Sequence, residues 1–285
     1  MIDLKILVTG ADGFTGKHFT QEAIKSGHTI FKLKSDLLNF TDLQKEIEQL
    51  SFEFVVHLAA ISFIPHSDSS EIYKVNVLGT INLLNAILKL EKPIKRILLA
   101  SSASVYGNNT NLTIDESQPA FPINHYACSK LSMEYMALTY INKLPIFITR
   151  PFNYIGPGQN KLFVVSKIVS HFKNRAESIV LGNLNVEREF NDVRFVCQSY
   201  LNLLQTSKVG EIYNICSGQS YNLNYILSLL ENMTGNKVYV DQDKSYFRVN
   251  EIKMLRGDPS KLKSCTGLNS EFSIFDSLKW IFDTI

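Results

Sequence analysis

The chain has 285 residues, 45% of them hydrophobic, and its 29 basic and 27 acidic residues give a formal net charge of +2. This length and apolar content can bury a large core, and the balanced charge without a dense basic run argues against nucleic acid as a partner. The four cysteines form no CxxC pair and the six histidines no HExxH motif. We therefore expect neither a metal site nor a disulfide framework.

The N-terminus does not resemble a signal peptide, and no apolar run approaches the ~20 residues of a membrane helix. We therefore expect a cytoplasmic protein with no membrane partner. Strand-like and helical segments alternate over the first 150 residues or so. The predicted strands are 4–9, 28–34, 54–58, 96–100 and 145–149. The predicted helices are 14–25, 41–50 with caps at Thr41 and Asp42, 71–89 and 125–140. The alternation predicts an α/β fold with a doubly wound parallel Rossmann sheet.

The pattern changes after Pro151, where loops lengthen around the sequence GPGQ. Short strands at 178–181 and 238–240 alternate there with helices at 163–172 and 224–233. We interpret residues 1–152 as a dinucleotide-binding domain and residues 153–285 as a smaller α/β substrate-binding domain. Segments near 189–216 are expected to return to the main sheet.

A glycine-rich loop follows the first predicted strand. In ILVTGADGFTG, Gly10, Gly13 and Gly16 lie between that strand and the next helix. Such a turn lets the backbone approach a pyrophosphate and presents helix N-terminal amides to its charge. The second strand ends in Lys32 and Lys34, where an NAD site usually has an acid for the ribose. Cations there would suit a 2′-phosphate, so NADP(H) is favoured as the cofactor and NAD(H) is the alternative.

The sequence HYACSK places Tyr126 and Lys130 four residues apart at the start of a predicted helix, so both side chains share one face. An ammonium group near a phenol favours phenolate and lowers its pKa. We therefore expect Tyr126 to exchange a proton with a carbonyl or hydroxyl near neutral pH. Ser101, Ser102 and Ser104 follow the fourth predicted strand in SSASVYG. For Ser101 and Ser104 the simplest interpretation is a strand-end hydroxyl satisfied by backbone.

In this order and spacing, GADGFTG, HLAA, VNVLGT, SSASVYG, YACSK and RPFNYIGPGQ resemble the extended short-chain dehydrogenase/reductase family. The family contains nucleotide-sugar epimerases, dehydratases and reductases. In the second half, LGNLNVEREFNDV, GEIYNICSG and GDPSKL are similar to two groups of its reductases. One group converts GDP-4-keto-6-deoxymannose to GDP-rhamnose and the other converts dTDP-4-keto-6-deoxyglucose to dTDP-fucose. One departure is Phe195, where relatives usually carry an acid that supports local structure.

The resemblance implies a role for each site residue. Ser102, Tyr126 and Lys130 would be catalytic. The cofactor would contact Gly10, Asp12, Gly13, Phe14, Thr15, Gly16, Lys32, Lys34, Asp36, Leu37, Leu58, Ala59, Ala60, Asn76, Ala100, Tyr126, Lys130 and Pro151. The nucleotide sugar would contact Ser102, Ser104, Asn153, Arg188, Arg248 and Glu251. Relatives commonly dimerise through the helices at 71–89 and 125–140, so a homodimer is expected.

The residues after Ser102 bear on the reaction. By the resemblance, the 4,6-dehydratases take a base and an acid from the next two positions, which are Ala103 and Ser104 here. Neither can remove a carbon-bound proton, so elimination of water is not expected. We expect NAD(P)H-dependent reduction of the C4 ketone of a GDP- or dTDP-linked 4-keto-6-deoxyhexose, in deoxysugar synthesis for surface polysaccharide. The alternatives are a C4 epimerase with tightly bound NAD and a non-catalytic dinucleotide sensor.

Overall fold

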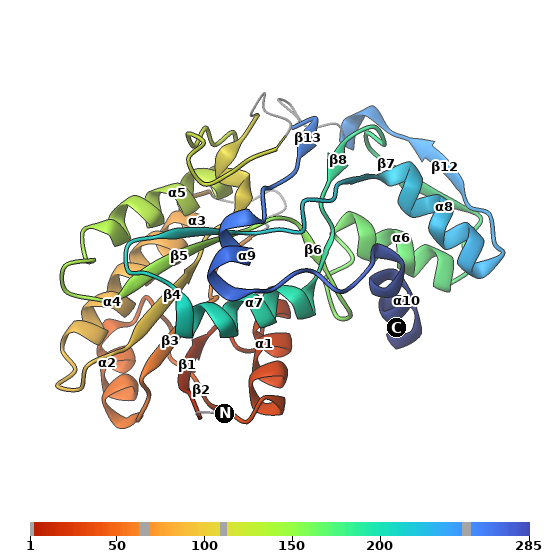
Figure 1. The fold of residues 1–285 in the computed structure, drawn as a ribbon. Helices are drawn as coiled ribbons and strands as arrows, with labels where there is room; N and C mark the ends of the chain where they lie inside the picture. The colour runs from red at the N-terminus through yellow and green to blue at the C-terminus, as the bar shows by residue number, and fades with distance from the viewer. Residues whose placement is uncertain (1–2, 63–68, 109–112, 247–251) are drawn as a thin grey trace.

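A six-stranded parallel sheet is formed by five strands within residues 5–151 and one later strand (Figure 1). The protein is described from a computed structural model, which covers residues 3–62, 69–108, 113–246 and 252–285. The strand order is β10-β5-β4-β3-β1-β2, and every neighbouring pair is parallel. The strands are β1 (Lys5–Thr9), β2 (Thr29–Lys32), β3 (Phe54–His57), β4 (Arg96–Ala100), β5 (Ile146–Pro151) and β10 (Ile212–Ile215). The doubly wound α/β prediction is confirmed.

Helices cover both faces of this sheet, each over its own apolar layer. One face packs against α1 (Phe14–Lys25) and α7 (Val193–Thr206), and its buried side chains include Ile6 and Val8 from β1. The intervening Leu7 points to the other face, under α2 (Phe40–Gln49), α4 (Thr80–Leu88) and α5 (His125–Leu138). This alternation along β1 is the pleat of a strand buried on both sides.

The helix predicted at 71–89 is not one regular α-helix. It consists of α3 (Ser69–Tyr73), the π-helical segment η1 (Lys74–Gly79) and α4. Short π-helical segments inside helices are rare and frequent at functional sites, and η1 contains the predicted site residue Asn76. The predicted caps of α2 were also wrong by a few residues, because Asn39 accepts the hydrogen bond from the Asp42 amide at 3.2 Å.

A second lobe lies beyond the carboxyl end of β5, at the right of Figure 1. Its core packs α6 (Val164–Lys173), α8 (Leu223–Thr234) and α10 (Ile274–Thr284) against the parallel pair β7 (Ser178–Leu181) and β12 (Tyr239–Gln242). A small sheet joins β8 (Glu187–Arg188), β11 (Tyr221–Asn222) and β13 (Met254–Leu255). The remaining elements are β6 (Tyr154–Ile155), β9 (Asn191–Asp192), α9 (Ser260–Thr266) and the 3-10 turns η2 (Ala103–Tyr106) and η3 (Lys244–Tyr246).

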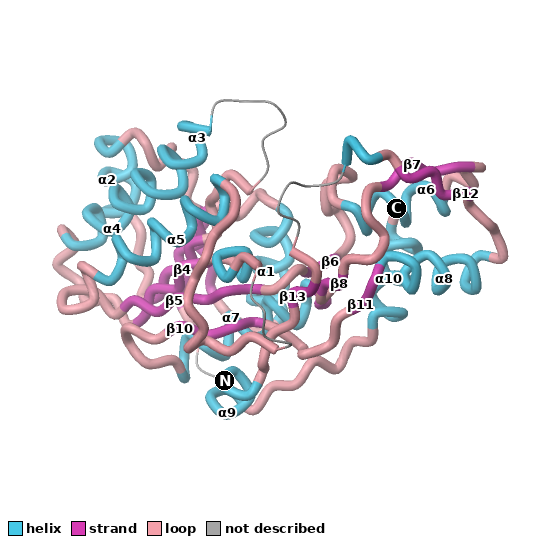
Figure 2. The backbone as a smooth tube through the Cα atoms, turned by 90° about the horizontal axis from the view of Figure 1, so that it is seen from above, coloured by secondary structure: helices cyan, strands magenta, loops and turns pink. Residues whose placement is uncertain are grey.

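The chain passes between the two lobes more than once. After the second lobe begins, α7 returns to the sheet and β10 pairs with β5, so residues 193–215 lie beside the first lobe (Figures 1 and 2). The domain limits predicted from the sequence stay a prediction.

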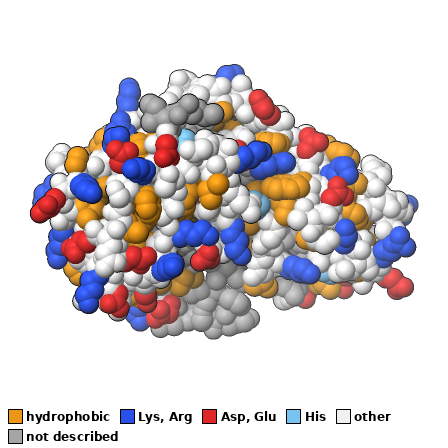
Figure 3. Space-filling model, turned by 90° about the horizontal axis from the view of Figure 1, so that it is seen from below, with side chains coloured by type: hydrophobic (Ala, Val, Ile, Leu, Met, Phe, Trp, Pro, Cys, Tyr) orange, Lys and Arg blue, Asp and Glu red, His pale blue; other side chains and the backbone are white. Residues whose placement is uncertain are grey.

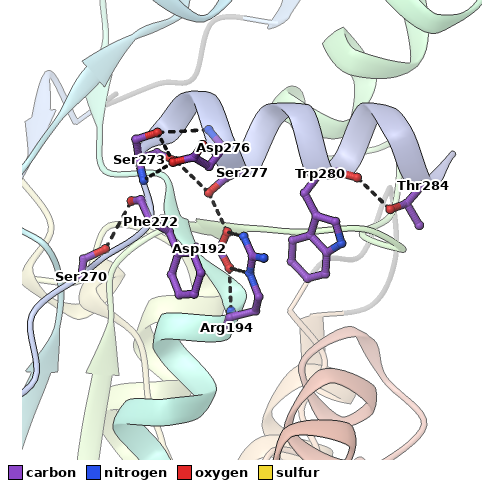
Figure 4. Close-up of polar contacts among 9 residues, drawn as sticks. All are labelled: Asp192, Arg194, Ser270, Phe272, Ser273, Asp276, Ser277, Trp280 and Thr284. Carbon is purple, nitrogen blue, oxygen red and sulfur yellow. Dashed lines mark hydrogen bonds and ion pairs between the residues drawn. The ribbon is translucent and has the colours of Figure 1, made fainter.

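A polar junction ties α7 to α10 (Figure 4). The buried Asp192 carboxylate binds the Arg194 guanidinium at 2.7 Å and accepts a hydrogen bond from the Ser277 hydroxyl at 2.7 Å. The Arg194 guanidinium lies 4.0 Å from the Trp280 ring, as a cation–π contact requires. Phe195, which the sequence comparison singled out as a departure, is buried in the core against the sheet. Its aromatic ring supplies apolar packing there.

The surface mixes both signs of charge. On the face shown in Figure 3, basic and acidic side chains are interspersed. In the part of the chain that the structure describes, no helix is long and apolar enough to cross a membrane. Within those same residues, no group of three or more His, Cys, Asp or Glu side chains could hold a metal ion. All four cysteines are free.

Candidate active site

The glycine loop lies where the strand order reverses, at the carboxyl ends of β1 and β3. The backbone at Gly10 has φ of +67°, and a Cβ atom there would approach the Ala59 nitrogen to 2.7 Å. The amides of Leu58 and Ala59 in turn donate to the carbonyl and side-chain oxygens of Thr9 at 3.2 and 3.1 Å. The loop after β1 and the loop after β3 are therefore held in direct contact, and ligands of doubly wound folds bind at such a crevice.

The start of α1 has the features of a pyrophosphate site. Gly13 is the N-cap residue, and no side chain caps the helix there. A Cβ atom on Gly13 would meet only the Gly10 carbonyl oxygen, at 3.2 Å, whereas one on Gly16 would lie 2.1 Å from that oxygen. Gly16 is thus required for the turn itself, and Gly13 leaves room beside the helix amides. An anion fits this position because the amides and the helix dipole favour negative charge.

Other predicted cofactor residues lie around this helix start. The Thr15 hydroxyl is hydrogen-bonded to the Tyr154 hydroxyl at 2.7 Å, and the Phe14 ring stacks on the Tyr154 ring with centroids 6.0 Å apart. Tyr154 follows β5, so these contacts join the glycine loop to the segment that enters the second lobe. Pro151, the last residue of β5, is buried and pairs with Ile215 of β10.

The loop after β2 carries the side chains predicted to distinguish NADP(H) from NAD(H). Lys32 forms a long, exposed ion pair with Asp12, 3.7 Å between Nζ and Oδ1. The Glu46 carboxylate of α2 accepts hydrogen bonds from the backbone amides of Lys34 and Ser35 at 2.9 and 2.7 Å. The Glu46 carboxylate therefore fixes the backbone of this loop.

The next two residues of this loop, Asp36 and Leu37, differ in exposure. The Asp36 carboxylate accepts a hydrogen bond from the Leu38 amide at 2.9 Å. The Leu37 side chain is buried against α4 and Gly79 of η1.

Asn76 links η1 to the loop after β3 and to α5. Its side-chain oxygen Oδ1 accepts a hydrogen bond from the Ile61 backbone amide at 2.8 Å, and its side-chain nitrogen Nδ2 donates one to the Ser129 hydroxyl at 3.0 Å. Ala60 directly precedes Ile61 and is half-buried. Asn76 is itself 1% exposed. It therefore fixes the loop that contains Ala59 and Ala60 relative to the helix that carries the tyrosine and lysine.

The predicted catalytic residues are close to one another. Asn124 caps α5 by accepting from the Ala127 amide at 2.9 Å, and this cap starts the helix one residue before Tyr126. The Tyr126 hydroxyl is hydrogen-bonded with the Ser102 side chain, and the Lys130 ammonium donates to the Ala100 carbonyl at 2.8 Å. Helix α5 thus aligns its tyrosine and lysine with the carboxyl end of β4.

The pKa values differ from the prediction that Lys130 lowers that of Tyr126. Burial raises the pKa of the Tyr126 phenol above its usual range, nearby Tyr154 raises it further, and the hydrogen bond with Ser102 lowers it in part. Burial lowers the pKa of Lys130 to about 8, against the upward effect of Glu134. The predicted lowering was wrong, because burial is the largest cause of the shift at Tyr126 and Lys130 is not among its causes; the Lys130 ammonium is directed to the Ala100 carbonyl instead.

The segment after Ser102 holds its hydroxyl in place. The Ser104 hydroxyl donates to the Ser102 hydroxyl at 2.9 Å, and Ser102 caps η2 by accepting from the Ser104 amide at 3.2 Å. Ala103 is buried at 1% exposure and has no ionisable group. The hydroxyl of Ser104 therefore contacts the Ser102 side chain directly, whereas only a backbone partner was expected for it.

A buried ion pair behind this serine segment was not identified from the sequence. The Ser101 hydroxyl donates to the Glu134 carboxylate, which also binds the Arg150 guanidinium at 2.6 Å. The interpretation of Ser101 as satisfied by backbone was therefore wrong. Glu134 is four residues after Lys130 and is followed by the largely apolar sequence YMAL. This spacing could have indicated a buried acid on the helix face of Lys130.

Of the predicted substrate residues, Ser102 and Ser104 follow β4, Asn153 lies after β5 and Arg188 lies in β8 of the second lobe. Asn153 is exposed, and its carbonyl accepts from the Asn191 amide at 2.9 Å. Arg188 donates to backbone carbonyls of Glu187 at 2.8 Å and of Ile252. The adjacent Glu189 is fully buried and also was not singled out from the sequence. Arg248 and Glu251 lie outside the described residues.

The comparisons with known proteins agree with this geometry. The family model described as GDP-mannose 4,6 dehydratase matches residues 29–279. GDP-6-deoxy-D-talose 4-dehydrogenase of Aggregatibacter actinomycetemcomitans is 35% identical, over 95% of this chain and 94% of its own. GDP-6-deoxy-D-mannose reductase of Pseudomonas aeruginosa is 33% identical, over 97% and 95%. The structure of RMD from Pseudomonas aeruginosa complexed with NADPH superposes with a TM-score of 0.91 at 31% identity, over 98% of both chains. The chain therefore belongs to the GDP-mannose 4,6-dehydratase family of extended short-chain dehydrogenase/reductases.

Proposed function

We propose that this protein uses NADPH to reduce the C4 ketone of a GDP-linked 4-keto-6-deoxyhexose. The arrangement of Ser102, Tyr126 and Lys130, with no acid at the two positions after Ser102, is the observation that carries the proposal. Proton transfer to one oxygen is possible with these groups, whereas elimination across C5 and C6 needs a base that positions 103 and 104 lack.

The proposed chemistry assigns one task to each residue. A nicotinamide cofactor, held by its pyrophosphate at the glycine loop, would supply the hydride. The Ser102 hydroxyl orients the C4 carbonyl by a hydrogen bond, and Tyr126 donates its phenolic proton to O4. The neutral phenol of Tyr126, which burial favours, carries the proton that the reduction consumes. Lys130 is proposed to bind the nicotinamide ribose and to balance the charge left on the tyrosine.

The names of the relatives favour GDP over dTDP as the nucleotide. The two sugars in those names, 6-deoxytalose and 6-deoxymannose, differ in configuration at C4 alone. The dehydrogenase name gives that position directly, and hydride transfer at C4 is the reaction that we propose for the present residues. NADPH is favoured over NADH by the bound NADPH of the solved relative and by Lys32 and Lys34 in the loop after β2.

The glycine loop and its surroundings are proposed as the cofactor site, with Arg188 and Asn153 on the nucleotide-sugar side. The proposed homodimer would use the helical faces of η1, α4 and α5. Leu78 of η1 and Tyr135 of α5 are 52% and 64% exposed, and such apolar side chains favour an interface. We propose that the reaction takes place in the cytoplasm and serves deoxysugar synthesis.

The proposal is tested by mixing the purified protein with NADPH and GDP-4-keto-6-deoxymannose, with the dTDP-linked 4-keto-6-deoxyglucose as a parallel substrate. We expect loss of NADPH absorbance with the GDP sugar and formation of a GDP-6-deoxyhexose, whose C4 configuration NMR assigns. No oxidation of NADPH with either sugar would refute the reductase assignment. The same three catalytic residues would also suit a C4 epimerase, which would interconvert two nucleotide sugars without consuming NADPH.

A further inference from the structure

Helix α5 presents a row of functional side chains to the end of β4. Tyr126 and Lys130 occupy successive turns, four residues apart, and contact Ser102 and the Ala100 carbonyl. The next position in this row, after a further four residues, is Glu134. Residues at this spacing lie one above the other on a helix face, so the row has three members and not two.

Tyr126 contacts Ser102 and Lys130 contacts Ala100, and Glu134 contacts the residue between them, Ser101. The Glu134 carboxylate accepts a hydrogen bond from the Ser101 hydroxyl. Both arms of the Arg150 guanidinium bind the same carboxylate, Nε at 3.0 Å and Nη2 at 2.6 Å. The side chain of Glu134 is 3% exposed and that of Arg150 is 6% exposed. Three consecutive residues, Ala100 at the end of β4 and the two serines that follow it, are thus contacted by three successive turns of α5.

The Arg150 side of this contact is also fixed. The guanidinium lies 4.7 Å from the centroid of the Tyr106 ring, whose hydroxyl donates to the Asn214 side chain at 2.8 Å. These side chains come from β5, η2 and β10. Glu134 is therefore anchored to the neighbouring strands, and its position does not depend on α5 alone. Bidentate arginine–carboxylate pairs of this kind add geometric specificity.

We propose that Glu134 is a positioning residue of the reaction: clamped by Arg150, its carboxylate fixes Ser101 and hence Ser102. This inference rests on the proposed reductase function. A buried ion pair is by itself weak evidence for a contribution to stability. The Glu134–Arg150 pair contacts Ser101 and belongs to the same row as Tyr126 and Lys130, so a role in the reaction explains it better.

The charge surroundings of Lys130 give the proposal a second readout. His57 on β3 is buried and neutral, since burial lowers its pKa to about 3. Arg150 on β5 is held in its pair with Glu134. Glu134 is the group that raises the pKa of Lys130, while burial lowers it to about 8. Removing the Glu134 charge therefore makes Lys130 lose its proton at lower pH.

The chain offers a matched control in the junction of Figure 4. Asp192 is also a buried carboxylate with an arginine partner, Arg194, and a serine donor, Ser277. These residues join α7 to α10 and contact none of the predicted catalytic side chains. Asp192→Asn and Glu134→Gln therefore make the same chemical change in comparable surroundings, and only the second touches the row on α5.

The test compares kinetics and NADPH binding of these variants. For Glu134→Gln we expect kcat to fall about 10- to 100-fold with KM for the sugar within about twofold, as for a catalytic group misplaced by a fraction of an ångström. The alkaline loss of NADPH affinity, followed by nicotinamide fluorescence, should move to lower pH. Glu134→Asp keeps the charge, so it should retain the wild-type pH dependence and recover part of kcat. Asp192→Asn should lower Tm but leave both readouts unchanged.

Wild-type kcat and pH dependence in a folded Glu134→Gln variant would overturn the inference. If that variant does not fold, Ser101→Ala tests the geometric part, because it removes one hydroxyl and leaves the ion pair intact. We expect a drop in kcat of about three- to tenfold with an unchanged pH dependence, and an unchanged kcat would overturn the inference. NADPH binding needs no sugar, so an inactive wild type would refute the proposed function while the binding experiment still tests Glu134.

Discussion

Alanine substitutions in the glycine loop separate cofactor binding from folding. At Gly16 an added Cβ would lie 2.1 Å from the Gly10 carbonyl oxygen and 2.6 Å from the Ala11 Cα, both backbone atoms. Relief requires the turn to move by more than an ångström, since ordinary contacts are ~3.5 Å or longer. Overpacking of this kind costs about 1–3 kcal/mol, and about 1 kcal/mol shifts Tm by roughly 2–4 °C in a chain near this size. Gly16→Ala should therefore lower Tm and weaken NADPH binding together.

Gly13→Ala should give a different result. Its φ of −72° suits any residue, and its Cβ would come only to 3.2 Å from the Gly10 oxygen. Tm should stay within about 2 °C of wild type, while the methyl group enters the space proposed for the pyrophosphate. Loss of one charge-assisted hydrogen bond predicts about 10- to 100-fold weaker NADPH binding.

The assay for both variants is thermal unfolding without ligand and fluorescence titration with NADPH. Gly267→Ala is the control, because its φ of +73° strains the helix end with no atom within 4 Å. It should cost about 1 kcal/mol and leave NADPH binding unchanged. Wild-type NADPH affinity in Gly13→Ala would refute the placement of the pyrophosphate. Wild-type Tm in Gly16→Ala would refute the claim that the turn has no room for a Cβ atom at that position.

Three further predictions concern the catalytic and cofactor residues. Tyr126→Phe should lower kcat about 100- to 10,000-fold with little change in KM, measured by NADPH oxidation, because it removes the proton donor; a smaller loss would mean that another group protonates O4. Lys130→Met should raise the free energy of unfolding at neutral pH by about 1–3 kcal/mol, because folding lowers the lysine pKa to about 8 and so penalises its ammonium below that pH. This advantage should shrink as pH rises above 8, and an advantage independent of pH would contradict the account. Lys34→Ala should reduce the ratio of NADPH to NADH affinity about tenfold in paired titrations, and an unchanged ratio would exclude Lys34 from 2′-phosphate binding.

The parallel sheet could be predicted because its strands are short apolar runs separated by amphipathic helices. The apolar run at 4–9 predicted the first strand, and the glycine spacing predicted the turn after it. The π-helical segment η1 could not be predicted, since nothing in the apolar pattern of residues 71–89 distinguishes it. It depends on the tertiary contacts of Asn76 with Ser129 and Ile61.

The placement of Tyr126 and Lys130 on one helix face was predictable from their local spacing, and their electrostatics were not. The pKa of Tyr126 depends on burial and on Ser102 and Tyr154, which are distant in the sequence. The ion pair of Glu134 with Arg150 likewise joins a helix to a strand, 16 residues apart. Burial and long-range partners arise only when the sheet assembles, so they outweigh the pairwise effect that a motif suggests.

The second lobe was predicted least well. Helices α9 and α10 were not identified, and α10 depends on a capping box at Ser273 and Asp276 and on the junction with Asp192. Short strands such as β8 and β13 have two residues each, too few for a periodic signal. Their pairing joins segments far apart in the chain.

The central claim, hydride transfer to C4 with proton donation by Tyr126, is tested most directly with NADPH deuterated at the transferable position. Incubation with GDP-4-keto-6-deoxymannose should place deuterium on C4 of the product, one label for each NADPH oxidised, as read by NMR and mass spectrometry. Tyr126→Phe should suppress this transfer while still binding NADPH. Deuterium absent from C4, or a product formed without oxidation of NADPH, would contradict the account.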